Sequence, residues 1–228
     1  MKILSVRKGF QADHSSTSYE FFAIDKPLNQ SERANVARLS SRARPTKRRV
    51  SFIYHGDWSD LPGGWGPLMR KYYDVMYSES YDWWTLAMAF NTDKKTIDHI
   101  KQFEFEGTDG MGVTVESDEN RVIISIFCHL YPGFDFGDDY DYYEDEYNED
   151  DFEVEETIES EDYLLNLLAE NRNHLENGDY RLLYGVWQKY GFELEDDDEL
   201  DEVIPPEPCG MDDLPKPIGT LLSFLEVH

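Results

Sequence analysis

The sequence has few cysteines and no pattern of residues that is typical of a metal site. Its 228 residues include 2 cysteines, Cys128 and Cys209, which lie in segments of different character. They do not pair at a metal-ligand spacing, so the sequence suggests neither a disulfide framework nor a zinc site. Cys128 lies in an apolar run and is interpreted as a small core residue. We predict no cofactor.

Long apolar segments are also absent. The first ten residues, MKILSVRKGF, contain an apolar run too short for the core of a signal peptide. No stretch approaches the roughly eighteen consecutive apolar residues that a membrane helix needs. We therefore expect a soluble, cytoplasmic protein without a membrane partner.

Basic residues are scarce and unevenly distributed. The chain has 21 Lys and Arg against 48 Asp and Glu, a net charge of -27 at pH 7. Residues 1–49 nevertheless carry an excess of basic residues, whereas residues 136–162 contain fifteen carboxylates and no Lys or Arg. A strongly negative protein repels polyanions, so we do not expect direct nucleic-acid binding. Another protein, with a basic surface, is a better candidate partner.

The first half of the chain combines strand-like and helix-like patterns. Short runs of β-branched and aromatic residues predict strands over residues 18–25, 49–55, 83–90 and 121–130. Helical spacing predicts a helix capped by Ser31, a second helix over residues 64–79 and a third over residues 93–101. The last of these strands is predicted to form the second half of a hairpin with its turn at residues 118–120. This order predicts an α+β (mixed α/β) fold, in which helices are interspersed with the strands of one sheet.

The second half changes in composition. We predict a body over residues 1–132, an acidic and aromatic-rich linker over residues 133–159, and a small helical module over residues 160–228. Ser160 and Asp179 are predicted to cap the first two helices of the module. Apolar residues from Ile218 to Leu225 indicate a closing helix.

Several segments resemble an uncharacterised bacterial protein family. These segments are YEFFAIDKPL and LSSRARPTKRRVSF near the start, with LENGDYRLLYGVWQ and PPEPCGMDDLPKPIGTLLSFLEV near the end. The resemblance covers the N-terminal third and most of the helical module, but Cys209 and Met211 depart from the family pattern. It implies a bacterial protein of two parts and brings no established activity.

Two polar loops contain candidates for catalysis. The segment QADHSSTS contains His14, and the segment YHGDWSD contains His55 and Asp57. A histidine near a carboxylate could act as an acid and base. Hydroxyl and carboxylate groups are also common in ordinary turns, where they bond to local backbone, and we favour that interpretation.

Two charged segments contain candidates for binding. Residues 38–49 contain six basic residues, among them Arg44, Lys47 and Arg48. The acidic linker contains Tyr140, Tyr142, Tyr143 and Tyr147, whose rings could anchor it to a basic surface. The favoured hypothesis is therefore a non-enzymatic, acidic interaction component of a bacterial assembly. A nucleic-acid mimic that inhibits a basic nucleic-acid-binding protein and an enzyme with an unfamiliar His/Asp site remain the alternatives.

Overall fold

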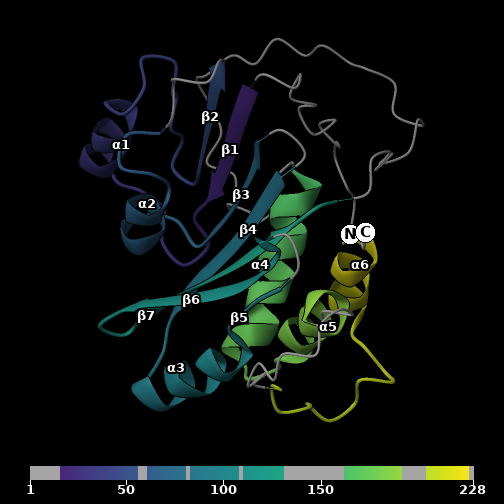
Figure 1. The fold of residues 1–228 in the computed structure, drawn as a ribbon. Helices are drawn as coiled ribbons and strands as arrows, with labels where there is room; N and C mark the ends of the chain where they lie inside the picture. The colour runs from purple at the N-terminus through teal and green to yellow at the C-terminus, as the bar shows by residue number, and fades with distance from the viewer. Residues whose placement is uncertain are drawn as a thin grey trace.

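The computed structural model describes residues 16–55, 61–80, 83–107, 110–130, 162–191 and 204–225. These residues form a mixed α+β fold around one antiparallel sheet of seven strands in the order β2-β1-β3-β4-β7-β6-β5 (Figure 1). The strands are β1 (Ser16–Phe22), β2 (Arg49–His55), β3 (Val75–Ser80), β4 (Trp83–Asn91), β5 (Phe105–Glu106), β6 (Gly112–Asp118) and β7 (Arg121–Cys128). The predicted fold class is confirmed.

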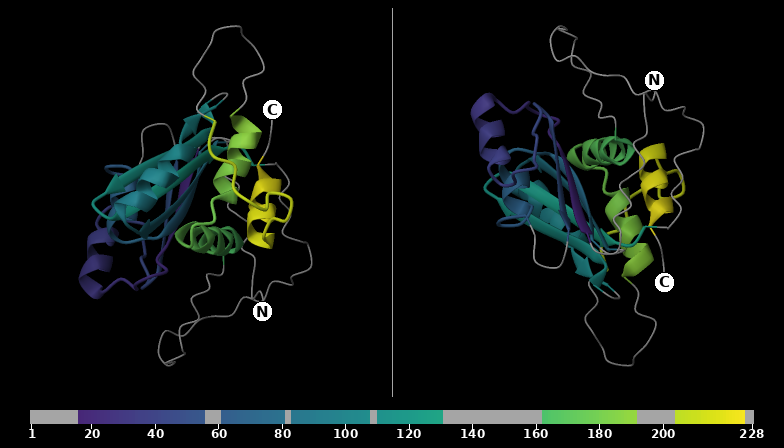
Figure 2. Two further views of the ribbon diagram at one scale, coloured as in Figure 1. Left: turned by 90° about the horizontal axis from the view of Figure 1, so that it is seen from below. Right: turned by 90° about the horizontal axis from the view of Figure 1, so that it is seen from above.

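Helices cover both faces of the sheet (Figure 2). The helices α1 (Gln30–Ala37) and α2 (Gly66–Lys71) lie on one face, where they share a core cluster with alternate residues of the strands. The other face carries a second cluster shared with α3 (Lys94–Ile100), the short 3-10 helix η1 (Lys101–Phe103), α4 (Tyr163–Glu176), α5 (Arg181–Tyr190) and α6 (Lys216–Phe224). Alternate strand residues point to opposite faces, so both faces of the central strands are apolar.

Of the C-terminal helices, α4 and α5 contact the sheet, and α6 packs on these two helices. Helix α4 contacts β3 and β4, and α5 and α6 contact each other. An isolated bridge between Leu130 and Leu225 joins the end of the sheet region to the residue after α6. The predicted linker, residues 133–159, lies outside the described residues, so the proposed division of the chain into a body and a module stays a prediction.

Local patterns predicted several elements correctly. The four predicted strands are found, with small shifts at their ends, as are the hairpin of β6 and β7 and the helices α3 and α6. Glu119, in the hairpin turn, has a positive φ of 51°. Cys128 is buried as predicted, and burial raises the pKa of its thiol.

Four predictions of local structure were wrong. Residues 64–79 do not form one helix, because α2 ends at Lys71 and Val75 begins the central strand β3. The cap of α1 is Asn29 instead of Ser31, and it forms a capping box with Glu32. The cap of α4 is Asp162, not Ser160, because the Asp162 carboxylate accepts the N–H of Leu165 at 3.1 Å. The cap of α5 is Tyr180 instead of Asp179, and Tyr180 forms no side-chain cap hydrogen bond.

No helix in the described segments is both long enough and apolar enough to span a bilayer.

Candidate functional site

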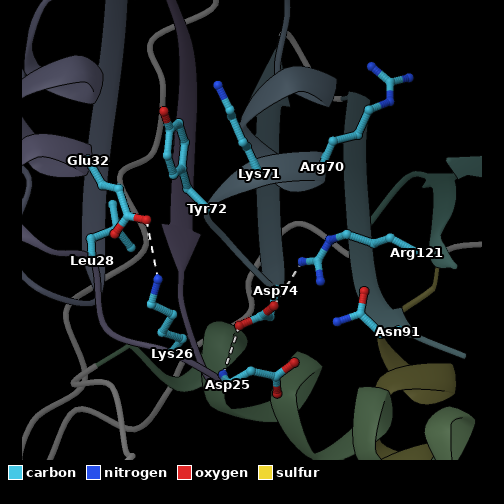
Figure 3. Close-up of a pocket in the computed structure, with 10 residues that line it drawn as sticks. All are labelled: Asp25, Lys26, Leu28, Glu32, Arg70, Lys71, Tyr72, Asp74, Asn91 and Arg121. Carbon is cyan, nitrogen blue, oxygen red and sulfur yellow. Dashed lines mark hydrogen bonds and ion pairs between the residues drawn. The ribbon is translucent and has the colours of Figure 1, made fainter. Parts of the chain in front are cut away.

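A polar pocket of about 250 Å³ lies at one end of the sheet. The end of β4, the start of β7, the residues before β3, the C-terminal part of α2 and the segment between β1 and α1 meet there (Figure 3). The residues that line it are Asp25, Lys26, Leu28, Glu32, Arg70, Lys71, Tyr72, Asp74, Asn91 and Arg121.

Asp74 forms the centre of the pocket floor. Its side chain is buried, and its Oδ2 accepts the backbone N–H groups of Ile24 and Asp25 at 2.7 and 2.9 Å. Its Oδ1 accepts Nη2 of Arg121 at 2.8 Å. The carboxylate thus joins the segment after β1 to the start of β7, which compensates its burial.

The Arg121 guanidinium is also bonded to backbone. Its Nε donates to the carbonyl of Met69 at 2.9 Å, and its Nη2 donates to the carbonyl of Tyr73 at 2.7 Å. The Met69 carbonyl lies in the last turn of α2, where carbonyl groups have no partner within the helix, and Tyr73 follows the C-cap Tyr72. Arg121 therefore holds α2 against the sheet in addition to neutralising Asp74.

Most of the remaining charges around the pocket are paired as well. Lys26 Nζ lies 3.4 Å from Glu32 Oε1, and Asp25 Oδ2 accepts Nη2 of the buried Arg172 at 2.6 Å. Arg70 points away from Arg121 and pairs with Glu116 (Figure 3). Because these pairs use the carboxylates of the lining, the pocket floor serves first to join elements of the fold.

Lys71 and Tyr72 form the open part of the pocket. Lys71 Nζ lies 5.7 Å from the centroid of the Tyr72 ring, and both side chains point in the same general direction (Figure 3). An ammonium beside an aromatic ring can contact an anionic or polar ligand. The lining contains no His, Cys, Ser or Thr, so the pocket residues do not form a nucleophile activated by histidine. Within the described segments, no group of three or more His, Cys, Asp or Glu could hold a metal ion.

A second polar cluster is buried between the sheet and the start of α4. Glu20 Oε2 accepts Nη2 of Arg49 at 2.9 Å and the hydroxyl of Ser51 at 2.6 Å. Asp162 Oδ2 accepts the hydroxyl of Tyr77 at 2.7 Å and Nη2 of Arg49 at 3.3 Å. Arg49 thus bridges two carboxylates on elements that are distant in the sequence.

Burial dominates the titration of this cluster. It raises the pKa of the Glu20 carboxyl above its ordinary value of 4.5, although the Arg49 charge and the bond from Ser51 oppose the rise. Burial, with Asp162 nearby, also raises the pKa of Tyr77. Since the phenol donates to Asp162, we interpret the cluster as the anchor of α4 on the sheet.

The predicted basic segment lies between α1 and β2 and is largely exposed. Arg44 Nη1 donates to the carbonyls of Ser41 and Ala43, both at 2.9 Å. Arg48 Nη1 donates to the carbonyls of Ala23 and Ile24 at 3.0 and 2.8 Å, and Lys47 is exposed. Two of the three predicted binding residues therefore also stabilise the fold locally, and their role in binding stays a prediction.

The side chains of the remaining predicted site residues fall outside the part of the structure that is described. His14, Asp57, Tyr140, Tyr142, Tyr143 and Tyr147 lie outside the described residues. His55 is the last residue of β2, and the position of its side chain is also outside the description. The hypothesis of a His/Asp site stays untested.

Sequence reasoning missed Asp74, Arg121 and Arg172. Asp74 lies in the stretch that was interpreted as helix, and the two arginines lie inside predicted elements without any motif. A single charged residue within an apolar stretch was the one available signal, because such residues are seldom buried unless they are paired.

Comparisons with protein-family models, curated proteins and solved structures gave no match to this chain.

Proposed function

We propose that the protein is a non-enzymatic interaction component of a bacterial assembly, and that residues 38–49 form one of its contact surfaces. The observation that carries this proposal is the group of exposed arginines in this segment. Arg38, Arg42 and Arg44 are exposed, and none of them forms an ion pair with a carboxylate in the described part of the chain.

Charge favours a protein over a nucleic acid as the ligand of this surface. Six basic residues could contact phosphates, but the net charge of -27 repels a long polyanion. A protein with a local acidic patch brings fewer negative charges near the rest of the chain than a nucleic acid does. A contact between such a patch and the arginines is expected to accelerate association and to weaken with salt. The basic partner that the net charge favours would contact the acidic segments of the chain instead of residues 38–49.

Fixed backbone geometry supports the same interpretation. The bonds that Arg44 and Arg48 donate to nearby carbonyls hold the segment in one conformation. A surface that is ordered before binding loses less conformational entropy when its partner arrives. Arg38 and Arg42 are exposed and take no part in these bonds, so they are the residues to alter.

The test compares two charge-matched double variants as bait in the lysate of the cell that makes the protein. One variant carries Arg38→Glu with Arg42→Glu, and its control carries Lys94→Glu with Lys95→Glu on the exposed face of α3. We expect quantitative mass spectrometry to show a partner that both wild type and the α3 variant retain and that the arginine variant loses. Equal recovery by both variants would refute residues 38–49 as a contact surface.

A further inference from the structure

We propose that the partner contributes an acidic, extended segment that adds to the sheet as a new strand beside β2. This inference rests on the proposed function and specifies its partner. The sheet ends at β2 on one side and at the two-residue strand β5 on the other. Among the described residues, β1 is the strand that pairs with β2, so the long outer side of β2 is the open edge of the sheet.

The register identifies which backbone groups of β2 face outward. Ala23 N–H donates to the carbonyl of Arg48 at 2.7 Å, and Ala23 and Arg48 lie in the same register as the β1 and β2 pairs. In an antiparallel pair, hydrogen-bonded and non-hydrogen-bonded residues alternate. Val50, Phe52 and Tyr54 therefore bond to β1, whereas the N–H and C=O groups of Arg49, Ser51 and Ile53 point away from it.

Thr46 occupies the first of these outward positions. Its backbone N–H donates to the carbonyl of Arg49 at 2.8 Å, and its hydroxyl oxygen accepts the N–H of Arg49 at 2.8 Å. These bonds confirm that the groups of Arg49 face outward, and they show that the chain itself closes this end of the edge. Ser51 and Ile53 follow with two N–H and two C=O groups in the correct orientation for an added strand.

The edge is held rigid by the packing on both sides of β2. The side chains of Val50 and Phe52 are buried against the α1 and α2 face, while Ser51 is bonded to Glu20 on the opposite face. The Phe52 ring packs against Phe21 with ring centroids 5.9 Å apart. An added strand would therefore meet a preformed template, which lowers the entropic cost of pairing.

Charge complementarity selects an acidic occupant. Residues 38–49 lead directly into β2 and contain six basic residues and no Asp or Glu. A strand with carboxylates on alternate residues would combine backbone pairing with attraction to Arg38, Arg42 and Arg44. Two copies of this chain, each with a charge of -27, would repel each other on approach, which disfavours β2 pairing between copies.

The experiment uses the full chain and a capped peptide of about seven residues that alternates Glu and Val, the period that one face of a strand requires. Its control is the same peptide with N-methyl groups on alternate backbone nitrogens, which keeps the charge and removes the strand donors. We expect the unmodified peptide to shift the amide NMR signals of Ser51 and Ile53. The methylated peptide is expected to bind at least about tenfold more weakly, the loss for one or two backbone hydrogen bonds.

The matched protein variants are Ile53→Pro and Ile53→Val. Proline removes an N–H that points away from β1, so the pairing of β1 with β2 is kept, and valine retains the N–H in a good strand former. We expect Ile53→Pro to reduce peptide affinity by about tenfold and Ile53→Val to leave it unchanged. If circular dichroism shows that Ile53→Pro does not fold, the comparison of the two peptides on wild-type protein decides the question.

The outcomes separate this inference from the proposed function. Equal binding of both peptides, lost in the Arg38→Glu, Arg42→Glu variant, would refute strand addition and leave a charged contact surface. If the unmodified peptide binds wild type, Ile53→Pro and the Arg38→Glu, Arg42→Glu variant equally well, both proposals are refuted. A concentration-dependent dimer in sedimentation that Ile53→Pro abolishes would identify a second copy as the occupant and overturn the acidic partner.

Discussion

Replacing Arg172 with alanine should destabilise the fold far more than replacing an exposed arginine. The Arg172 side chain is 3% exposed, and its Nε donates to the carbonyl of Ala89 at 2.7 Å. Asp74 lies opposite Ala89 in the extension of the β3–β4 pair, and its N–H would be the usual donor to the Ala89 carbonyl. That N–H donates to the carbonyl of Phe22 instead, so the Ala89 carbonyl relies on Arg172. Arg172 thus replaces a missing bond of the sheet and ties α4 to β4.

The expected magnitude follows from the exposure of each partner. Leaving the Ala89 carbonyl buried without a donor costs about 1–3 kcal/mol. The carboxylates of Asp25 and Glu176 are 43% and 40% exposed, so water can solvate them once the guanidinium is gone. Each of these ion pairs is therefore worth about 0–1 kcal/mol. We expect Arg172→Ala to lower the free energy of unfolding by about 3 kcal/mol in total.

Urea unfolding followed by circular dichroism measures this loss, and Arg70→Ala is the control. Arg70 is 41% exposed and pairs with Glu116, which is 48% exposed, so its replacement should cost under about 1 kcal/mol. The midpoint of Arg172→Ala should fall with little change in the slope of the transition. A midpoint for Arg172→Ala equal to that of Arg70→Ala would refute the role assigned to the buried guanidinium.

Three further predictions concern a thiol, a glycine and a carboxylate. Cys128 is buried and Cys209 exposed, so a thiol reagent at pH 8 should modify one cysteine in the folded chain and two in urea; two fast reactions in the folded chain would contradict the burial. Gly107→Ala should destabilise the fold by roughly 2 kcal/mol or more, measured by urea unfolding, because its Cβ would overlap the backbone carbonyl of Tyr190. The bond from Arg181 holds the pKa of Asp179 below its usual 3.8, so Asp179 stabilises the fold above that pH and loses this contribution as the pH falls through its folded value. Asp179→Asn should therefore lower the unfolding midpoint at pH 7 and approach wild type below pH 3.8, and a difference independent of pH would contradict this assignment.

The wrong prediction of a helix where β3 lies shows a limit of local sequence patterns. The spacing of Trp65, Leu68, Met69, Tyr72 and Met76 matches a helical face, and α2 does use the first part of it. The residues that follow form a strand buried on both faces, and such a strand produces a continuous apolar run without alternation. Periodicity cannot separate that run from a buried helix, so the sheet topology had to decide it.

The pocket and the buried arginines could not be predicted from local patterns either, because their partners are distant in the sequence. Asp74 and Arg121 are 47 residues apart, and Asp25 and Arg172 are 147 apart. Nothing near any of these residues in the sequence specifies its partner. The cap of α4 is Asp162 and not Ser160 for a similar reason. Tyr77 and Arg49, which are distant in the sequence, donate hydrogen bonds to the Asp162 carboxylate and stabilise it at that position.

The sequence by itself determined the α+β class, most of the strands, the turn of the β6–β7 hairpin and the burial of Cys128, because each follows from interactions among neighbouring residues. It also identified the exposed basic segment. The tertiary structure alone decided the order of the strands, the pairing of the buried charges and the position of β2 at the edge of the sheet. These features depend on which segments, distant in the sequence, pack against each other and bury their surfaces. A local sequence pattern does not specify the segment against which it packs.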